Sequence, residues 1–147
     1  MSNKFIESES ELWNEIINWL FELDKKGVSK ATEFINLFSD ENTNKERVIS
    51  DLFVWIKEYA TQKNDALALY FVGKCYYLGD KIPRDCETGL HYLQMASKLE
   101  NKDALYWLGN YYSENKDIEN ALKYFREAER LGHDKASRAI SIIELQT

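Results

Sequence analysis

The sequence predicts an all-α fold, a right-handed solenoid of helical hairpins with about eight helices. The first observation is a repeat, because the spacing of Ala68, Tyr70 and Gly73 returns 36 residues later. The second is that the segment beginning at Asp85 has a copy 32 residues on. Periods of this length, each built from two helical segments, are typical of helical solenoids. The third is composition, since one proline and six glycines in 147 residues leave long segments free to be helical.

Equivalent positions of the two copies carry the same residue types, and several types have a packing reason. Glycine inside a helix costs about 1 kcal/mol relative to alanine, so Gly73 and Gly109 are expected at contacts where only a hydrogen atom fits. Aspartate is a favoured N-cap, so Asp85 and Asp117 are expected where helices begin. The other recurring pairs are Ala68 and Ala104, Tyr70 and Tyr106, Tyr76 and Tyr112, Leu90 and Leu122, Tyr92 and Tyr124, and Ala96 and Ala128.

Three helices are predicted ahead of the repeats. The first covers about residues 10–25, where apolar side chains fall three and four positions apart, as on an amphipathic helix. The second covers about residues 29–38, and the third about residues 45–62. The polar segment 39–44 between them is a loop by composition. The apolar residues of the first helix are Leu12, Trp13, Ile16, Ile17, Leu20 and Leu23.

The repeats follow as two hairpins and a closing helix. The hairpins pair about residues 65–78 with 85–99 and about residues 103–114 with 117–131, and the last helix covers about 134–145. We expect one domain over residues 1–147. Its parts are a non-repeat helical segment at 1–62, a first repeat at 65–99, a second repeat at 103–131 and a capping helix at 134–145.

The loop inside the first hairpin, residues 79–85, reads GDKIPRD and is longer than an ordinary tetratricopeptide turn. Together with the recurring positions it resembles the Sel-one-like repeat, a branch of the tetratricopeptide-like solenoids. The first copy matches that signature at Ala68, Gly73, Tyr76, Gly79, Ile82, Pro83, Asp85, Gly89, Leu90, Tyr92 and Ala96. The second matches at Ala104, Leu108, Gly109, Tyr112, Asp117, Ala121, Leu122, Tyr124, Ala128 and Gly132, and its loop is four residues shorter. The resemblance covers residues 65–132, and in a degenerate third copy Ser141 replaces the glycine.

The charge of the chain is uneven. The net charge is −6, and residues 1–62 carry 7 Lys+Arg against 12 Asp+Glu, whereas residues 63–147 carry 12 against 13. Such a field disfavours nucleic-acid binding, which depends on neutralising phosphates, and favours a basic protein partner. Solubility alone is the other explanation. The acidic residues expected to steer a basic partner are Glu7, Glu9, Glu11, Glu15 and Glu22.

Residues that could support catalysis or hold a metal ion are few. The histidines are His91 and His133, and the cysteines are Cys75 and Cys86. On a helix Cys86 and His91 diverge by about 140°, so they do not form a nucleophile and base pair. The spacing of Cys75, Cys86 and His91 lacks the tight ligand spacing of structural zinc motifs. We expect no catalytic residue, no metal and no cofactor, with the cysteines as free thiols.

A candidate binding surface lies on the first helix of each hairpin, which lines the inner face in solenoids of this type. Tyr70, Lys74 and Tyr77 share one helical stripe, because they are four and three residues apart. The expected binding residues are Tyr70, Lys74 and Tyr77, their equivalents Tyr106, Asn110 and Ser113, and Arg138 at the matching place on the last helix. We expect the stripe as a whole to be exposed. The alternative is that the tyrosines complete the core, which we expect for one or two of them.

The resemblance implies a non-catalytic protein-interaction module. Adaptors and scaffolds are known in this family, and its bacterial members include small proteins that neutralise toxins. Two roles therefore remain open, an adaptor and an immunity protein that binds a basic toxin or effector. A metal-dependent or thiol enzyme and a self-associating structural module are the rival classes. No apolar run approaches the ~18–20 residues of a membrane span and no signal-peptide pattern occurs, so we expect a cytoplasmic protein.

Overall fold

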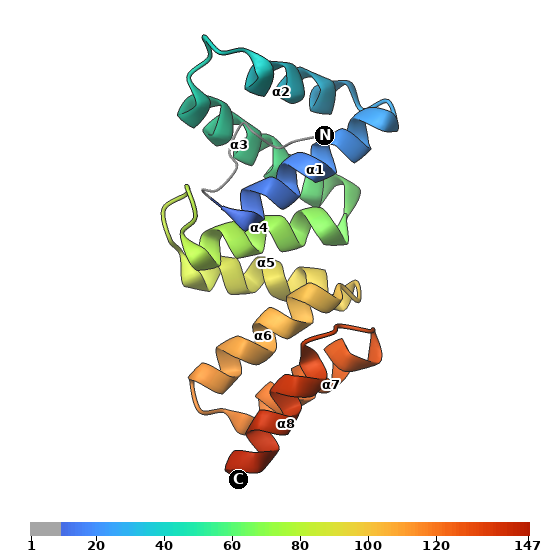
Figure 1. Ribbon diagram of the computed structural model, residues 1–147, viewed down its shortest axis with the longest axis vertical. Coiled ribbons are helices and arrows are strands. Elements are labelled where there is room, and N and C mark those ends of the chain that lie inside the picture. The colour runs from blue at the N-terminus through green and yellow to red at the C-terminus, as the bar shows by residue number, and fades with distance from the viewer. Residues whose placement is uncertain (1–9) are drawn as a thin grey trace.

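The computed structural model describes residues 10–147, and within them eight helices stack along one long axis (Figure 1). The predicted all-α solenoid of helical hairpins is confirmed. The helices are α1 (Glu11–Lys25), α2 (Ser29–Ser39), α3 (Lys45–Lys63), α4 (Ala66–Leu78), α5 (Cys86–Lys98), α6 (Lys102–Glu114), α7 (Ile118–Arg130) and α8 (Ala136–Gln146). Figure 1 shows α2 and α3 at one end of the stack and α7 and α8 at the other, with α1 lying between α2 and α4.

Side-chain caps begin most of the helices, because a side-chain oxygen accepts a hydrogen bond from a free backbone N–H of the first turn. Asp85 accepts from the N–H of Thr88, and Asp117 accepts from the N–H of Asn120, as predicted. The start of α6 differs from the prediction. Its cap is Asn101, which accepts from the N–H of Ala104 at 2.9 Å, so the helix begins before Asp103.

Two glycines set how closely the helices of each hairpin approach. A Cβ atom on Gly73 would lie 2.9 Å from Cγ of Leu93 on the neighbouring helix. One on Gly109 would lie 2.6 Å from Cδ1 of Phe125. Neither distance is available to real carbon atoms, so the prediction that only a hydrogen atom fits at these positions is confirmed. The close contact offsets the low helix propensity of glycine.

The core is continuous from α1 to α6, and a second cluster joins α7 to α8. Helix α1 packs against α2 and also against α4. The indole of Trp13, which is fully buried, donates from Nε1 to the backbone oxygen of Asp80 at 3.0 Å, and the hydroxyl of Ser10 donates to the Asp80 carboxylate. The non-repeat helices are thus attached to the loop of the first hairpin through long-range contacts.

Candidate functional site

A groove opens between α6 and α8, and we call it the inner groove. It has a volume of about 470 Å³. It is lined by Tyr106, Asn110, Ser113, Phe125, Lys135, Arg138, Ala139, Ile142, Ile143 and Gln146. The residues of α6 are three and four positions apart, and those of α8 form one stripe, so a single face of each helix lines the groove. Phe125 of α7 is buried and forms its floor.

Four predicted binding residues come together in the inner groove. They are Tyr106, Asn110, Ser113 and Arg138. The register of the predicted degenerate third copy puts Arg138 at the position of Tyr106, and Arg138 lines the groove together with the α6 residues. The side chains of Asn110, Ser113 and Arg138 make no hydrogen bond or ion pair within residues 10–147, so their polar groups are free to bind a ligand. That a partner binds through them stays a prediction.

The other three predicted residues, on α4, lie in a different environment. Tyr70 and Tyr77 are only 4% and 7% exposed, so the stripe is not exposed as a whole, and these two tyrosines complete the core, as the alternative allowed for one or two of them. The cause is α6, which presents Trp107 and Tyr111 to α4. Burial raises the pKa of the Tyr70 hydroxyl. Tyr77 packs edge-on against the rings of Trp107 and Tyr111, with centroids 5.8 and 6.4 Å apart.

Lys74, the third of these residues, is half-buried and already engaged. Its ammonium lies 4.8 Å from the ring centroid of Trp107 and 5.5 Å from that of Tyr70. A cation over an aromatic face is attracted to the ring quadrupole, so Lys74 joins α4 to α6. The sequence prediction overlooked Trp107, although its position one residue after Tyr106 at the junction of two repeats indicated a contact with the preceding hairpin.

His133 packs against Tyr106, which lines the inner groove. The two rings stack with centroids 4.3 Å apart and an interplanar angle of 10°. Nε2 of His133 lies 3.3 Å from the carboxylate of Asp103, and Nδ1 lies 3.9 Å from that of Asp134. Burial of the imidazole lowers the pKa of His133, although the Asp103 carboxylate acts in the opposite direction. The histidine therefore joins the turn before α8 to α6.

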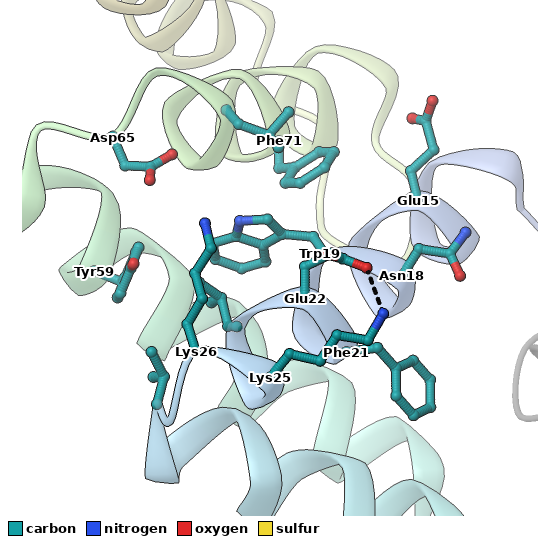
Figure 2. A pocket seen from close by; sticks show the side chains of 13 residues that line it. Glu15, Asn18, Trp19, Phe21, Glu22, Lys25, Lys26, Tyr59, Asp65 and Phe71 are labelled. Atoms are coloured by element: carbon teal, nitrogen blue, oxygen red, sulfur yellow. Dashed lines mark hydrogen bonds and ion pairs between the residues drawn. The ribbon is translucent and has the colours of Figure 1, made fainter.

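A larger groove, which we call the N-terminal groove, lies between α1, α3 and α4 (Figure 2). Its volume is about 830 Å³. Figure 2 shows Trp19 near its centre, with Phe71 of α4 above the indole. The Trp19 ring packs edge-on against Tyr59 and Phe71, with centroids 5.5 and 5.7 Å apart. The lining residues are Glu15, Asn18, Trp19, Phe21, Glu22, Leu23, Lys25, Lys26, Val28, Tyr59, Asp65, Leu67 and Phe71.

The predicted steering residues that the structure describes are exposed on α1. They are Glu11, Glu15 and Glu22; Glu7 and Glu9 lie outside the described residues. Glu22 forms an ion pair with Lys25 at 3.1 Å, drawn as a dashed line in Figure 2. Desolvation raises the pKa of Glu15, and the nearby ammonium of Lys74 lowers it in part. The N-terminal groove thus carries acidic side chains beside two lysines, whereas no acidic side chain lines the inner groove.

Cys75, Cys86 and His91, which the sequence analysis weighed for catalysis or zinc binding, line neither groove. Cys75 is fully buried as a free thiol, and burial raises its pKa, which holds the sulfur in its protonated form. Cys86 is half-buried and free, and the exposed His91 packs edge-on against Tyr92. Among residues 10–147, no group of three or more histidine, cysteine or acidic residues is placed to hold a metal ion. No helix of this part of the chain is long and apolar enough to cross a membrane.

Comparison with known proteins identifies a family for the repeat region. The family model described as the Sel1 repeat matches residues 66–101 and 102–133. The first match takes in α4, the long loop and α5, and the second takes in α6 and α7. A search of curated proteins finds no match.

Proposed function

Because this chain contains two consecutive Sel1 repeats and is a Sel1-like repeat protein, we propose that it is a non-catalytic module that binds a segment of a partner protein in the inner groove. The observation that carries the proposal is the meeting of Tyr106, Asn110 and Arg138 across the groove. Tyrosine and arginine are enriched at interface hot spots. The exposed Ile142 adds apolar area beside the polar groups.

The polar side chains of the inner groove are better suited to binding a ligand than to stabilising the fold. A side chain that holds the fold together is normally buried or paired, whereas Asn110, Ser113 and Arg138 have no partner within the described residues. A bound segment would supply partners to several donors at once, with Phe125 as an apolar floor. Substitution of these residues is therefore expected to change binding and to leave stability almost unchanged.

The test is a selection of short random peptides displayed on phage against the immobilised protein. Peptides that depend on the inner groove bind the wild type and lose binding to Arg138→Glu. The matched control is Arg126→Glu, which makes the same charge change at an exposed position on α7 outside the groove. Loss of binding in Arg138→Glu alone supports the proposal. Peptides that bind all three proteins equally contradict it.

A second candidate function is inhibition of a basic toxin, the role of an immunity protein. The observation that favours it is the exposure of Glu11, Glu15 and Glu22 on α1, beside the N-terminal groove. Acidic side chains attract a basic protein over a distance and raise the association rate. A bacterial source and a cytoplasmic location belong to this candidate and stay predictions.

Co-expression with the product of a neighbouring toxin-like gene tests the inhibitor role. The expected result is rescue of growth by the wild type. The charge reversal Glu11→Lys with Glu15→Lys is expected to slow association, while Glu41→Lys with Glu144→Lys, at exposed positions away from α1, has a smaller effect. Absence of rescue by well-expressed wild-type protein excludes that toxin as the partner.

A further inference from the structure

The charge of the inner groove is opposite to that of the chain as a whole. The chain has a net charge of −6. Lys135 and Arg138 are the charged residues that line the groove, and no carboxylate lines it. The N-terminal groove, by contrast, is lined by Glu15, Glu22 and Asp65 as well as by two lysines. The inner groove is thus a locally basic site in an acidic protein.

The polar lining of the groove is rich in hydrogen-bond donors. The Lys135 ammonium and the Arg138 guanidinium donate only, and the amides of Asn110 and Gln146 donate through their NH₂ groups. None of these four side chains makes a hydrogen bond or ion pair within residues 10–147. A guanidinium fits a carboxylate with two parallel hydrogen bonds, which gives both strength and orientation.

The helix that carries the cations adds to the same preference. Helix α8 has no acidic residue in its first turn, and its N-cap residue Lys135 makes no side-chain cap. The free N–H groups at that end carry partial positive charge. The Glu129 carboxylate at this end of α8 accepts a hydrogen bond from the Ser137 hydroxyl and does not line the inner groove. Asp134 and Asp103, the nearby acids, lie beside His133.

The apolar part of the groove limits what else the ligand contains. Ile142 is 46% exposed, and Ala139 and Ile143 continue its side of the groove over the buried ring of Phe125. A volume of about 470 Å³ lies within the range of side-chain and small-ligand sites and holds a few side chains of a segment. The site therefore suits an acidic side chain next to an aliphatic or aromatic one.

We propose that the inner groove binds an acidic peptide segment of a partner protein, with a carboxylate on Arg138 and Lys135 and a neighbouring apolar side chain over Ile142 and Phe125. This inference rests on the proposed function, because it gives the chemistry of the segment that the groove binds. It is independent of the inhibitor role, which uses the acidic α1 and a basic partner.

The test uses peptides from the phage selection, synthesised with a fluorescent label and titrated with the whole chain. Groove-dependent peptides are expected to be enriched in Asp and Glu. Lys135→Glu with Arg138→Glu is expected to weaken their binding about tenfold or more, because charge is reversed at the contact. The control Lys98→Glu with Arg126→Glu makes an equal charge change at exposed positions outside the groove and is expected to change affinity about twofold at most. Circular dichroism verifies that both variants are folded.

The outcomes separate the two proposals. Groove-dependent peptides that are neutral or basic overturn the acidic segment and leave the proposed function intact. No groove-dependent peptide at all overturns both. Light scattering tests whether a second copy of the chain occupies the groove. Self-association that is abolished by Arg138→Glu would show this and would contradict the binding of an acidic partner segment. The proposal of an acidic segment is supported if acidic peptides bind more weakly to Lys135→Glu with Arg138→Glu and bind the control variant with unchanged affinity.

Discussion

The imidazole of His133 stacks on the phenol ring of Tyr106, with centroids 4.3 Å apart and the planes 10° from parallel. His133 lies in the turn before α8, and Tyr106 lines the inner groove from α6. The stack, with the contact of His133 to Asp103, therefore fixes the distance between the two helices that form the groove.

Stability is expected to fall as the pH is lowered through the range in which His133 titrates. Burial holds the pKa of His133 in the folded chain below its ordinary value of 6.5, so the unfolded chain binds the proton more tightly. The free energy of unfolding is therefore highest above about pH 6.5 and decreases below it. Denaturant unfolding measured between about pH 7.5 and pH 5 checks the direction. His133→Gln is expected to lose this dependence, and an equal slope in wild type and variant would show that other groups cause it.

Alanine at Gly109 is expected to destabilise the protein by about 1–3 kcal/mol, the usual cost of overpacking. The added Cβ would lie 2.6 Å from Cδ1 of Phe125. The free-energy cost of this clash exceeds the stability that alanine gains over glycine through its higher helix propensity. The matched control is Ser141→Ala, because Ser141 takes the place of the glycine in the third copy and is exposed. Its effect is expected within about 0.5 kcal/mol. Thermal unfolding that ranks the two variants in the opposite order would contradict the packing argument.

Tyr70→Ala is expected to cost about 3–5 kcal/mol of unfolding free energy, as for other large buried aromatic residues. Tyr70 is 4% exposed, and its ring lies under the Lys74 ammonium. Asn110→Ala, on the same predicted stripe, is expected to change stability by about 0.5 kcal/mol at most. Chemical denaturation of both variants distinguishes a core residue from a binding residue. A small loss of unfolding free energy in Tyr70→Ala would contradict the core role and favour Tyr70 as a binding residue.

The bond between Trp13 and the Asp80 backbone is expected to determine how α1 is held. Trp13→Phe leaves the partly buried Asp80 oxygen without its 3.0 Å donor and is expected to cost about 1–3 kcal/mol. Trp55→Phe, which also shortens an indole in the N-terminal core but removes no hydrogen bond within the described residues, is the control and is expected to cost less. Hydrogen exchange of the α1 amides reports the effect locally. Equal protection of α1 in the two variants would argue against this role of Trp13.

The repeats and helices could be predicted because their signals are local. Apolar spacing identified each helix, and the recurrence of Gly73 as Gly109 identified the hairpins and their close contact. The same register placed Arg138 on the groove side of α8. These features depend on neighbours a few residues away or on a fixed period.

What the sequence did not predict depends on long-range packing. Tyr70 and Tyr77 are buried because Trp107 and Tyr111 of the next hairpin face them, and one stripe in isolation contains no information about what covers it. The N-terminal groove combines α1, α3 and α4, which do not follow one repeat pattern. The stack of His133 on Tyr106 likewise depends on how the turn before α8 folds back to α6.

The most direct test of the central claim is an NMR titration of the isotopically labelled chain with the tightest peptide from the selection. Binding in the inner groove predicts that backbone amide shifts concentrate in residues 106–113 and 135–146, on α6 and α8. It also predicts that Arg138→Glu removes these shifts and that Arg126→Glu keeps them. Shifts concentrated on α1 and around Trp19, with the amides of α6 and α8 unmoved, would place the binding site in the N-terminal groove and contradict the account.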